Sequence, residues 1–404
     1  MLRVLAKKSS INLAVRIFGS LCSLVMSAYI ARNYSLYSAG AFFLMISYIS
    51  ILSSISLFGL NNELMRKASF FFTEGDYKRL GQLFTSCSFT MITGALFLGF
   101  FLFIFKFSFV TSSIILAIPF VSLITFCGIF LQSCNRYVYS SLIQFVLLPI
   151  SVVIGLIAFS NNVEIEVIYL LSAVLVSVVG LYQVSKTLSH KVAFKIAITK
   201  TTTSLLVFQI LFVINQNIGQ VLLDIYSSND DVAIFSVSKR ITMTLGFAVT
   251  AINAIAAPKL SSYFLKNDMR GLRSTIKNSS RILVAFSVPV IGFIFLFPEF
   301  LLSFFGKEYT SQISINVFLI LALGQIVNVV TGTVAYLLIM TNNESAHLKN
   351  LIIASVCSFS LYIFLMPKGI YGISLMIAFS MVIQNILSWY SCKKLLNVNT
   401  LNLL

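Results

Sequence analysis

The stretch at residues 230–258, DDVAIFSVSKRITMTLGFAVTAINAIAAP, decides the fold because it is apolar enough to cross a bilayer yet carries Lys239 and Arg240 side by side. If its helix runs from about residue 232 to 256, Arg240 lies roughly 6 Å from the bilayer midplane. A cation at that depth costs from about 2.5 to well over 10 kcal/mol, so it normally faces a polar cavity or a counter-charge. The nearby acids lie toward one end: Asp224, Asp230 and Asp231. We therefore expect a membrane transporter with a hydrated, cationic interior and an anionic ligand.

The composition of the whole chain is that of a membrane protein. The chain has 404 residues, of which 58% are hydrophobic and only 10% charged, and its mean hydropathy is +0.96. Apolar runs of about 20 residues predict membrane-spanning helices and exclude the alternating pattern of an outer-membrane barrel. The opening MLRVLAKKSS passes directly into an apolar segment without a small-residue cleavage site, which predicts a retained first helix. The six cysteines form no C-x-x-C pair, so neither a disulfide nor a metal site is expected.

Hydropathy predicts an all-α polytopic protein with twelve membrane spans. Their approximate bounds are residues 11–31, 38–60, 82–105, 110–132, 138–159, 164–184, 201–225, 232–256, 278–298, 312–340, 347–366 and 369–391. An even number of spans leaves both chain ends on one side. That side receives most of the 28 basic residues, whereas the other side receives Arg32, Lys106, Lys307 and Lys368. Because basic residues favour cytoplasmic loops, we expect a plasma-membrane (cell inner membrane) protein with both ends in the cytoplasm.

The net charge of +16 is explained by this loop asymmetry, so it indicates no nucleic-acid partner. The longest connections on the cytoplasmic side are residues 61–81, 185–200 and 257–277. All three are basic and mildly amphipathic, so we expect short helices along the membrane surface.

The two halves of the chain share a repeat. At one constant shift, without a gap, residues of the first half meet identical residues of the second, among them the pairs Tyr34 and Tyr226, Phe43 and Phe235, Asn61 and Asn253, Lys67 and Lys259, and Asp76 and Asp268. Two six-helix units in the same orientation are parallel repeats about an axis along the membrane normal. We therefore expect an N-terminal lobe at residues 1–190, a cytoplasmic linker at 191–200 and a C-terminal lobe at 201–404, around a central cavity.

Polar residues in the first span of each predicted lobe are candidates for lining that cavity. In the first span they share one helical face: Asn12, Arg16, Ser20, Ser23 and Ser27. The seventh span carries the carboxamides Asn215, Gln216, Asn217 and Gln220. Carboxamides are hard to leave facing lipid, and they serve either as glue between helices or as ligand contacts.

The candidate binding residues are Arg240, Lys239, Arg16, Asn215, Gln216, Asn217, Gln220, Asn12 and Asn253. An arginine can bond a phosphate with two parallel hydrogen bonds, whereas a lysine offers a point charge. The structural alternative for Lys239 and Arg240 is burial against polar neighbours such as Gln216 or Asn217. For Arg16 it is snorkelling to the nearby membrane surface.

Two stretches resemble a known family. ARNYSLYSAGAFFLMISYISILSSISLFGLNNELMRKAS is similar to the first loop, second helix and following basic segment of the polysaccharide flippases called Wzx. These belong to the multidrug/oligosaccharidyl-lipid/polysaccharide (MOP) exporter superfamily. VAIFSVSKRI resembles that family's G-x-Y-x-x-A-x-K/R opening of helix eight, although Val232 and Phe235 stand where Gly and Tyr are common. Asn217, or Asn215, lies near where many members carry an acid, which puts proton or sodium coupling through that acid in doubt.

The resemblance implies a fold like that of the multidrug and toxin extrusion (MATE) transporters, across the whole chain. It implies an alternating-access flippase that moves polyprenyl-diphosphate-linked oligosaccharide to the outer leaflet for O-antigen (lipopolysaccharide) or capsule assembly. The implied partners are this lipid, the bilayer, and polysaccharide polymerase and chain-length machinery, with no cofactor.

Two alternatives remain open at the level of sequence. A major-facilitator-type or MATE-like exporter of small molecules shares two parallel repeats, but the loop sequence GDYKRLG only superficially approaches the G-x-x-x-D-[R/K]-x-G-R turn of the former. A membrane polymerase or ligase would need a large external loop with catalytic bases, and the predicted external loops are short. No paired carboxylate, His cluster or G-x-x-x-x-G-K-[S/T] motif indicates catalysis, so we expect no enzyme.

Overall fold

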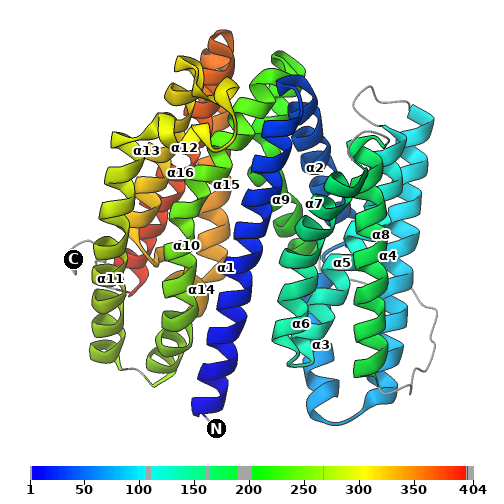
Figure 1. The fold of residues 1–404 in the computed structure, drawn as a ribbon. Helices are drawn as coiled ribbons and strands as arrows, with labels where there is room; N and C mark the ends of the chain where they lie inside the picture. Colours follow the sequence, from blue (N-terminus) through cyan, green and yellow to red (C-terminus); the bar gives the residue numbers. More distant parts are fainter. Residues whose placement is uncertain are drawn as a thin grey trace. The chain divides into compact units, whose positions relative to one another are not determined.

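A computed structural model describes the backbone of residues 2–105, 111–159, 163–188, 203–266, 268–341, 343–396 and 398. Within these ranges, side chains are described except at 2–10, 62, 63, 66, 203–208, 245, 247, 248, 250, 251, 253–255, 257–259, 261, 262, 265 and 286. Across this described part of the chain every regular element is helical and no strand occurs (Figure 1).

The long helices are α1 (Leu2–Asn33), α2 (Leu36–Ser56), α4 (Tyr77–Phe105), α5 (Ser112–Ser133), α8 (Ile165–Thr187), α9 (Thr203–Tyr226), α10 (Asn229–Leu265), α11 (Met269–Leu296), α13 (Gln312–Thr331), α15 (Glu344–Leu365) and α16 (Gly369–Leu396). The shorter elements are α3 (Leu60–Thr73), α6 (Tyr137–Ser141), the π-helix η1 (Leu142–Val146), α7 (Leu147–Phe159), α12 (Pro298–Ser303), the 3₁₀-helix η2 (Lys307–Thr310), α14 (Val334–Met340) and the 3₁₀-helix η3 (Met366–Lys368).

The predicted all-α polytopic membrane fold is confirmed. Within the described residues, nine helical segments are long and apolar enough to cross a membrane, and one of them, Glu344–Leu396, contains both α15 and α16. The two further predicted spans, 201–225 and 232–256, correspond to α9 and α10, whose side chains are described only in part. Large apolar side chains on long helices are widely exposed, for example Phe97 at 70% and Phe364 at 80%, as lipid contact requires.

Two predicted boundaries are wrong. The span expected at 312–340 is broken, because Gly332 has a φ of 72° and separates α13 from α14. Glycine adopts this left-handed conformation without a steric cost, so it ends the helix. The connection expected along the membrane surface at 257–277 instead extends α10 to Leu265 and begins α11 at Met269. At about 1.5 Å per residue, α10 is longer than a bilayer core, so its basic end can reach water without lying flat.

The structure describes the backbone of one of the other two predicted surface helices in full and only the beginning of the other. The one at 61–81 corresponds to α3, whose Leu60, Leu64 and Ala68 are fully buried at a spacing of four residues, against α4 and α5. Only residues 185–188 of the connection 185–200 lie within the described residues, where they end α8 and its cap.

The element bounds follow the register of the sequence repeat. α2 begins at Leu36 and α10 at Asn229, while α4 begins at Tyr77 and α11 at Met269. The halves differ between these points. In the first half Phe58 (φ 45°) and Gly59 (φ 70°) interrupt the helix before α3, whereas α10 continues through the equivalent positions.

The chain forms two compact units. Unit 1 contains residues Met1–Tyr29 and Leu44–Ile218, and unit 2 contains Ile30–Phe43 and Gly219–Leu404. These units differ from the predicted lobes, 1–190 and 201–404, in two segments. The first part of α9 clusters with unit 1, and the connection from α1 to α2 clusters with unit 2, because helices can extend from one packed body into another.

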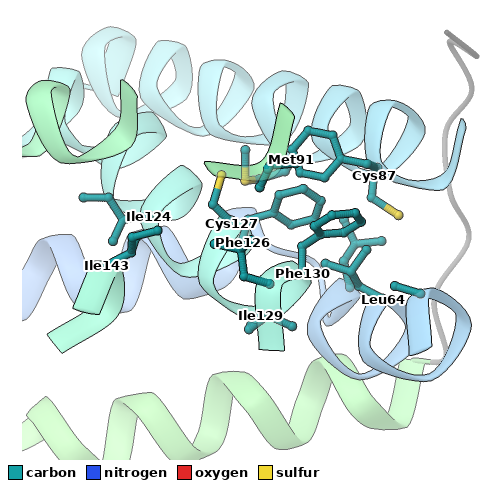
Figure 2. Packing of buried hydrophobic residues seen from close by; sticks show 14 of the residues in the cluster. Leu64, Cys87, Met91, Ile124, Phe126, Cys127, Ile129, Phe130 and Ile143 are labelled. Carbon is teal, nitrogen blue, oxygen red and sulfur yellow. The ribbon is translucent and has the colours of Figure 1, made fainter. Parts of the chain in front are cut away.

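The core of unit 1 forms where α3, α4, α5 and α8 meet. Phe84 packs on Phe126 and Phe130, with ring centroids 5.3 and 4.8 Å apart. Figure 2 shows Phe126 and Phe130 beside Met91, with Leu64 of α3 close by. This apolar cluster is fully enclosed, so the polar candidates of unit 1 lie elsewhere.

In unit 2, α13 packs along α16 and α10, and α10 packs along α11 (Figure 1). Gly324 permits the close approach of α13 and α16, because a Cβ there would lie 2.9 Å from the Cα of Ala378. Small residues serve this purpose in membrane helix pairs. The resulting bundle holds α10, and with it Lys239 and Arg240, against fixed neighbours.

Candidate functional site

Lys239 and Arg240 are both partly buried on α10, and each lies near an aromatic ring. The Lys239 Nζ lies 3.4 Å from the Gln220 Oε1 of α9 and 6.0 Å from the centre of the Phe235 ring. The Arg240 Cζ lies 5.1 Å from the centre of the Phe43 ring of α2. Both α10 cations, Gln220 and the two rings belong to unit 2. We call these five residues the α10 cation site.

The spacing of α9 and α10 within unit 2 depends on Gly219. A Cβ at this position would lie 2.6 Å from the Cζ of Phe235, closer than packed atoms allow. The missing side chain therefore lets Phe235 pack against α9, next to Gln220. Since Lys239 is one turn after Phe235 on α10, its ammonium group comes close to both the ring and the carboxamide.

The guanidinium of Arg240 lies over the ring of Phe43. A guanidinium donates five N–H groups in its own plane, whereas an aromatic ring attracts it through its face. A partly buried arginine of this kind is a candidate contact for a phosphate or carboxylate.

A second polar group occurs in unit 1, where α1 meets α6 and the π-helix. The Arg16 Nε donates a hydrogen bond of 3.3 Å to the Ser141 Oγ, and Ser141 donates one of 2.5 Å to the Asn12 Oδ1. The Arg16 Cζ also lies 5.3 Å from the centre of the Phe145 ring, within the π-helix. Gly19 makes this contact possible, because a Cβ there would lie 2.7 Å from the Cβ of Phe145.

The serines of the α1 face have a local explanation. Ser20 donates to the carbonyl of Arg16 at 3.1 Å, and Ser27 donates to the carbonyl of Ser23 at 2.7 Å. Such bonds satisfy a hydroxyl within its own helix. Arg16 and Asn12 do contact another element, through Ser141 of α6.

The carboxamides of α9 that were predicted to line the cavity differ from one another in their surroundings. Asn217 donates a hydrogen bond of 2.9 Å to the carbonyl of Val213, within α9. Gln216 is exposed, and Asn215 is partly buried. These three residues belong to unit 1, whereas Gln220 belongs to unit 2. The side chain of Asn253 lies outside the described residues.

Sequence reasoning missed the aromatic partners of the cations. The contact between Phe235 and Lys239 could have been predicted from the sequence, because Phe235 precedes Lys239 by one helical turn. Phe43 and Phe145 are distant in sequence from Arg240 and Arg16, so no periodicity connects them. Among the described residues, no group of three His, Cys, Asp or Glu side chains could hold a metal ion.

Comparisons with known proteins agree on the architecture. Residues 204–367 match the MatE family model. A search of curated proteins finds no match. Among solved structures, the chain is similar to the lipid II flippase MurJ in an inward closed conformation, with a TM-score of 0.69 and 15% identity, covering 95% of this chain and 87% of that chain.

Two MATE transporters are also similar. An inward-facing multidrug resistance transporter of the MATE family and MOP superfamily gives a TM-score of 0.65 at 13% identity, covering 96% of this chain and 98% of that one. The multidrug transporter DinF-BH gives a TM-score of 0.62 at 14% identity, covering 99% and 96%. The chain therefore has the fold of the MATE transporters and of MurJ, and its residues 204–367 match the MatE family model.

Proposed function

We propose that this protein is a Wzx-type flippase, which moves polyprenyl-diphosphate-linked oligosaccharide from the cytoplasmic to the outer leaflet by alternating access. The observation that carries the proposal is the α10 cation site, with Lys239 and Arg240 inside an apolar bundle. The likeness to a lipid II flippase supports a lipid-linked substrate. The product would enter O-antigen (lipopolysaccharide) or capsule assembly.

The diphosphate is the part of such a substrate that resists transfer. An ionised group in hydrocarbon carries a solvation cost of tens of kcal/mol, of which protein cations and hydrogen bonds can offset a large share. Arg240 and Lys239 would contact the diphosphate, with Gln220 near the first sugars. Arg16, Asn12, Asn215, Gln216, Asn217 and Asn253 would line the rest of the path. The lipid tail would remain in the bilayer.

A MATE-like exporter of small molecules is the second candidate, because the MatE match and the similar MATE structures favour it equally. The charge of the substrate discriminates between the two. Adjacent cations at the α10 cation site would repel a cationic drug and attract a phosphate-bearing lipid. An enzymatic role has less support, since the similar proteins are transporters and flippases.

The proposed setting is the plasma membrane of the cell, with both chain ends in the cytoplasm. Polymerase and chain-length machinery would act on the translocated lipid. The basic excess of one set of connections supports this orientation.

Arg240→Ala tests the proposal in the native cell. We expect surface polysaccharide to disappear while the amount of protein in the membrane stays unchanged, because the substitution removes the cation and leaves the bundle intact. The matched control is Arg79→Ala, which removes an exposed arginine that is paired with Asp76 at 3.3 Å. Surface polymer at the wild-type level in Arg240→Ala cells would contradict the proposal.

A further inference from the structure

The connection between α1 and α2 clusters with the opposite half of the chain. Residues Ile30–Phe43 belong to unit 2, although the preceding part of α1 and the following part of α2 belong to unit 1. The chain therefore passes from unit 1 to unit 2 between residues 29 and 30, and returns to unit 1 between residues 43 and 44. We call Ile30–Phe43 the α1–α2 segment.

In the α1–α2 segment a short connection joins the end of α1 to the beginning of α2. Only residues 34 and 35 separate α1 from α2. The Tyr34 N–H donates to the Ile30 carbonyl at 3.1 Å, and the Ser38 N–H donates to the Ser35 Oγ at 3.2 Å. These bonds cap both helix ends, so the segment would dock or release as one body.

Its contact with α10 is unusually close. A Cβ on Gly40 would lie 1.8 Å from the carbonyl oxygen of Asn229 and 3.2 Å from the backbone nitrogen of Ala233. Both atoms belong to the backbone, so no side chain can move aside. Only glycine permits this approach of α2 to the first turn of α10.

The α1–α2 segment also contacts the end of α12, and Gly306 lies near it. The Arg32 Nη2 donates to the Ser303 carbonyl at 3.3 Å. A Cβ on Gly306 would lie 3.6 Å from the carbonyl oxygen of Ala31, which is ordinary van der Waals contact. Ala31 is 4% exposed. The α1–α2 segment thus packs closely on α10 at Gly40 and is hydrogen-bonded to α12 through Arg32.

A buried phenol lies beside this contact. Tyr309 is fully buried, and its hydroxyl has no hydrogen-bond partner among the described residues. Burial, followed by the carboxylates of Glu308 and Asp230, raises the pKa of Tyr309. A buried hydroxyl without a partner is destabilising, and water could satisfy it if the segment moved away.

The last residue of the α1–α2 segment reaches the candidate site. Phe43 is 2% exposed, and the centre of its ring lies 5.1 Å from the Cζ of Arg240. Release of the segment would withdraw this ring. The orientation of Arg240 is consequently coupled to docking at Gly40.

We propose that the α1–α2 segment is a latch that docks on unit 2 and acts through Phe43 as a positioning element for Arg240. With the latch docked, the ring of Phe43 holds the guanidinium of Arg240 in the orientation that contacts a diphosphate. With the latch released, Arg240 loses this support and the affinity for the diphosphate falls. The positioning step rests on the proposed function, whereas the docking step does not.

Docking is tested without any ligand, by chemical labelling of Ala31→Cys in the full-length protein in lipid nanodiscs. The rate of maleimide modification at this residue, followed by mass spectrometry, measures how often the latch opens. Gly40→Ala should raise the rate at least about tenfold, because a Cβ cannot coexist with the docked backbone. Gly292→Ala is the matched control, since no atom lies within 4 Å of a Cβ at this helical glycine.

Arg32→Ala provides a second variant in case Gly40→Ala does not fold. It removes one hydrogen bond at an exposed site, so labelling should rise about twofold to tenfold. Labelling of both variants at the rate of the control would overturn the latch.

Positioning is tested by binding of undecaprenyl diphosphate to the same purified proteins. Phe43→Leu should weaken binding about twofold to thirtyfold, the range expected for a cation–π contact. In an Arg240→Ala background the same substitution should cause no further loss, because Phe43 acts through Arg240. Equal losses in both backgrounds would overturn the positioning role. If the wild-type protein itself does not bind the probe, the proposed function and the positioning role fall together, and labelling still decides the latch.

Discussion

Lys239 and Arg240 are neighbours in sequence but have different partners. Lys239 contacts Gln220 and the ring of Phe235, whereas Arg240 stacks on Phe43. Adjacent residues differ by about 100° around a helix, so this divergence is expected. The sequence alone indicated that the two cations need a polar cavity, a counter-charge or polar neighbours. It could not identify Phe43, because a contact between distant residues leaves no local pattern.

The two cations should also differ in function. Arg240→Lys keeps the charge but removes the planar fork, so we expect the affinity for undecaprenyl diphosphate to fall about tenfold. Lys239→Arg keeps a cation at the other position and should change the affinity less than about threefold. Isothermal titration of the purified variants measures both. Equal losses at the two positions would show that Arg240 acts only as a point charge.

At the scale of elements, the π-helix Leu142–Val146 is the feature that hydropathy could not predict. Its residues are almost all apolar, and such a run fits an α-helix or a π-helix equally well. π-helical turns occur frequently at functional sites. Here the turn carries Phe145, the ring beside Arg16. The break at Gly332 was missed for a similar reason, since glycine is common within membrane helices.

Packing of α1 on the π-helix can be tested through Gly19. In Gly19→Ala the new Cβ would meet backbone atoms of Phe145 at 2.8 to 2.9 Å, so the helices must separate. We expect a loss of stability of about 1–3 kcal/mol, as in other overpacked sites. Thermal unfolding in detergent measures this change. The control Gly292→Ala should be neutral or slightly stabilising, and equal melting of the two variants would refute the close approach.

At the scale of the whole molecule, hydropathy predicted the helical class and most spans, because apolar length is a local property. Unit membership was not predictable in this way. Ile30–Phe43 and the first part of α9 join units that their sequence positions do not suggest. The unit to which a segment belongs depends on contacts between residues that are far apart in the sequence. Hydropathy is calculated from neighbouring residues, so it carries no information on such contacts.

The orientation of the chain follows from its charge asymmetry. We expect reporter proteins fused at either end to be active in the cytoplasm, because most basic residues fall in connections on that side. Activity of an alkaline phosphatase fusion at the C-terminus, which requires export, would reverse the proposed orientation.

Translocation itself is the most direct test of the account. Wild-type protein in liposomes should transfer a fluorescent undecaprenyl-diphosphate-linked saccharide between leaflets, measured as loss of fluorescence to an impermeant quencher. Arg240→Ala should transfer it no faster than protein-free liposomes. Equal transfer by the wild type and Arg240→Ala, or transfer of a cationic dye in place of the lipid, would contradict the claim that the α10 cation site carries a diphosphate across the membrane.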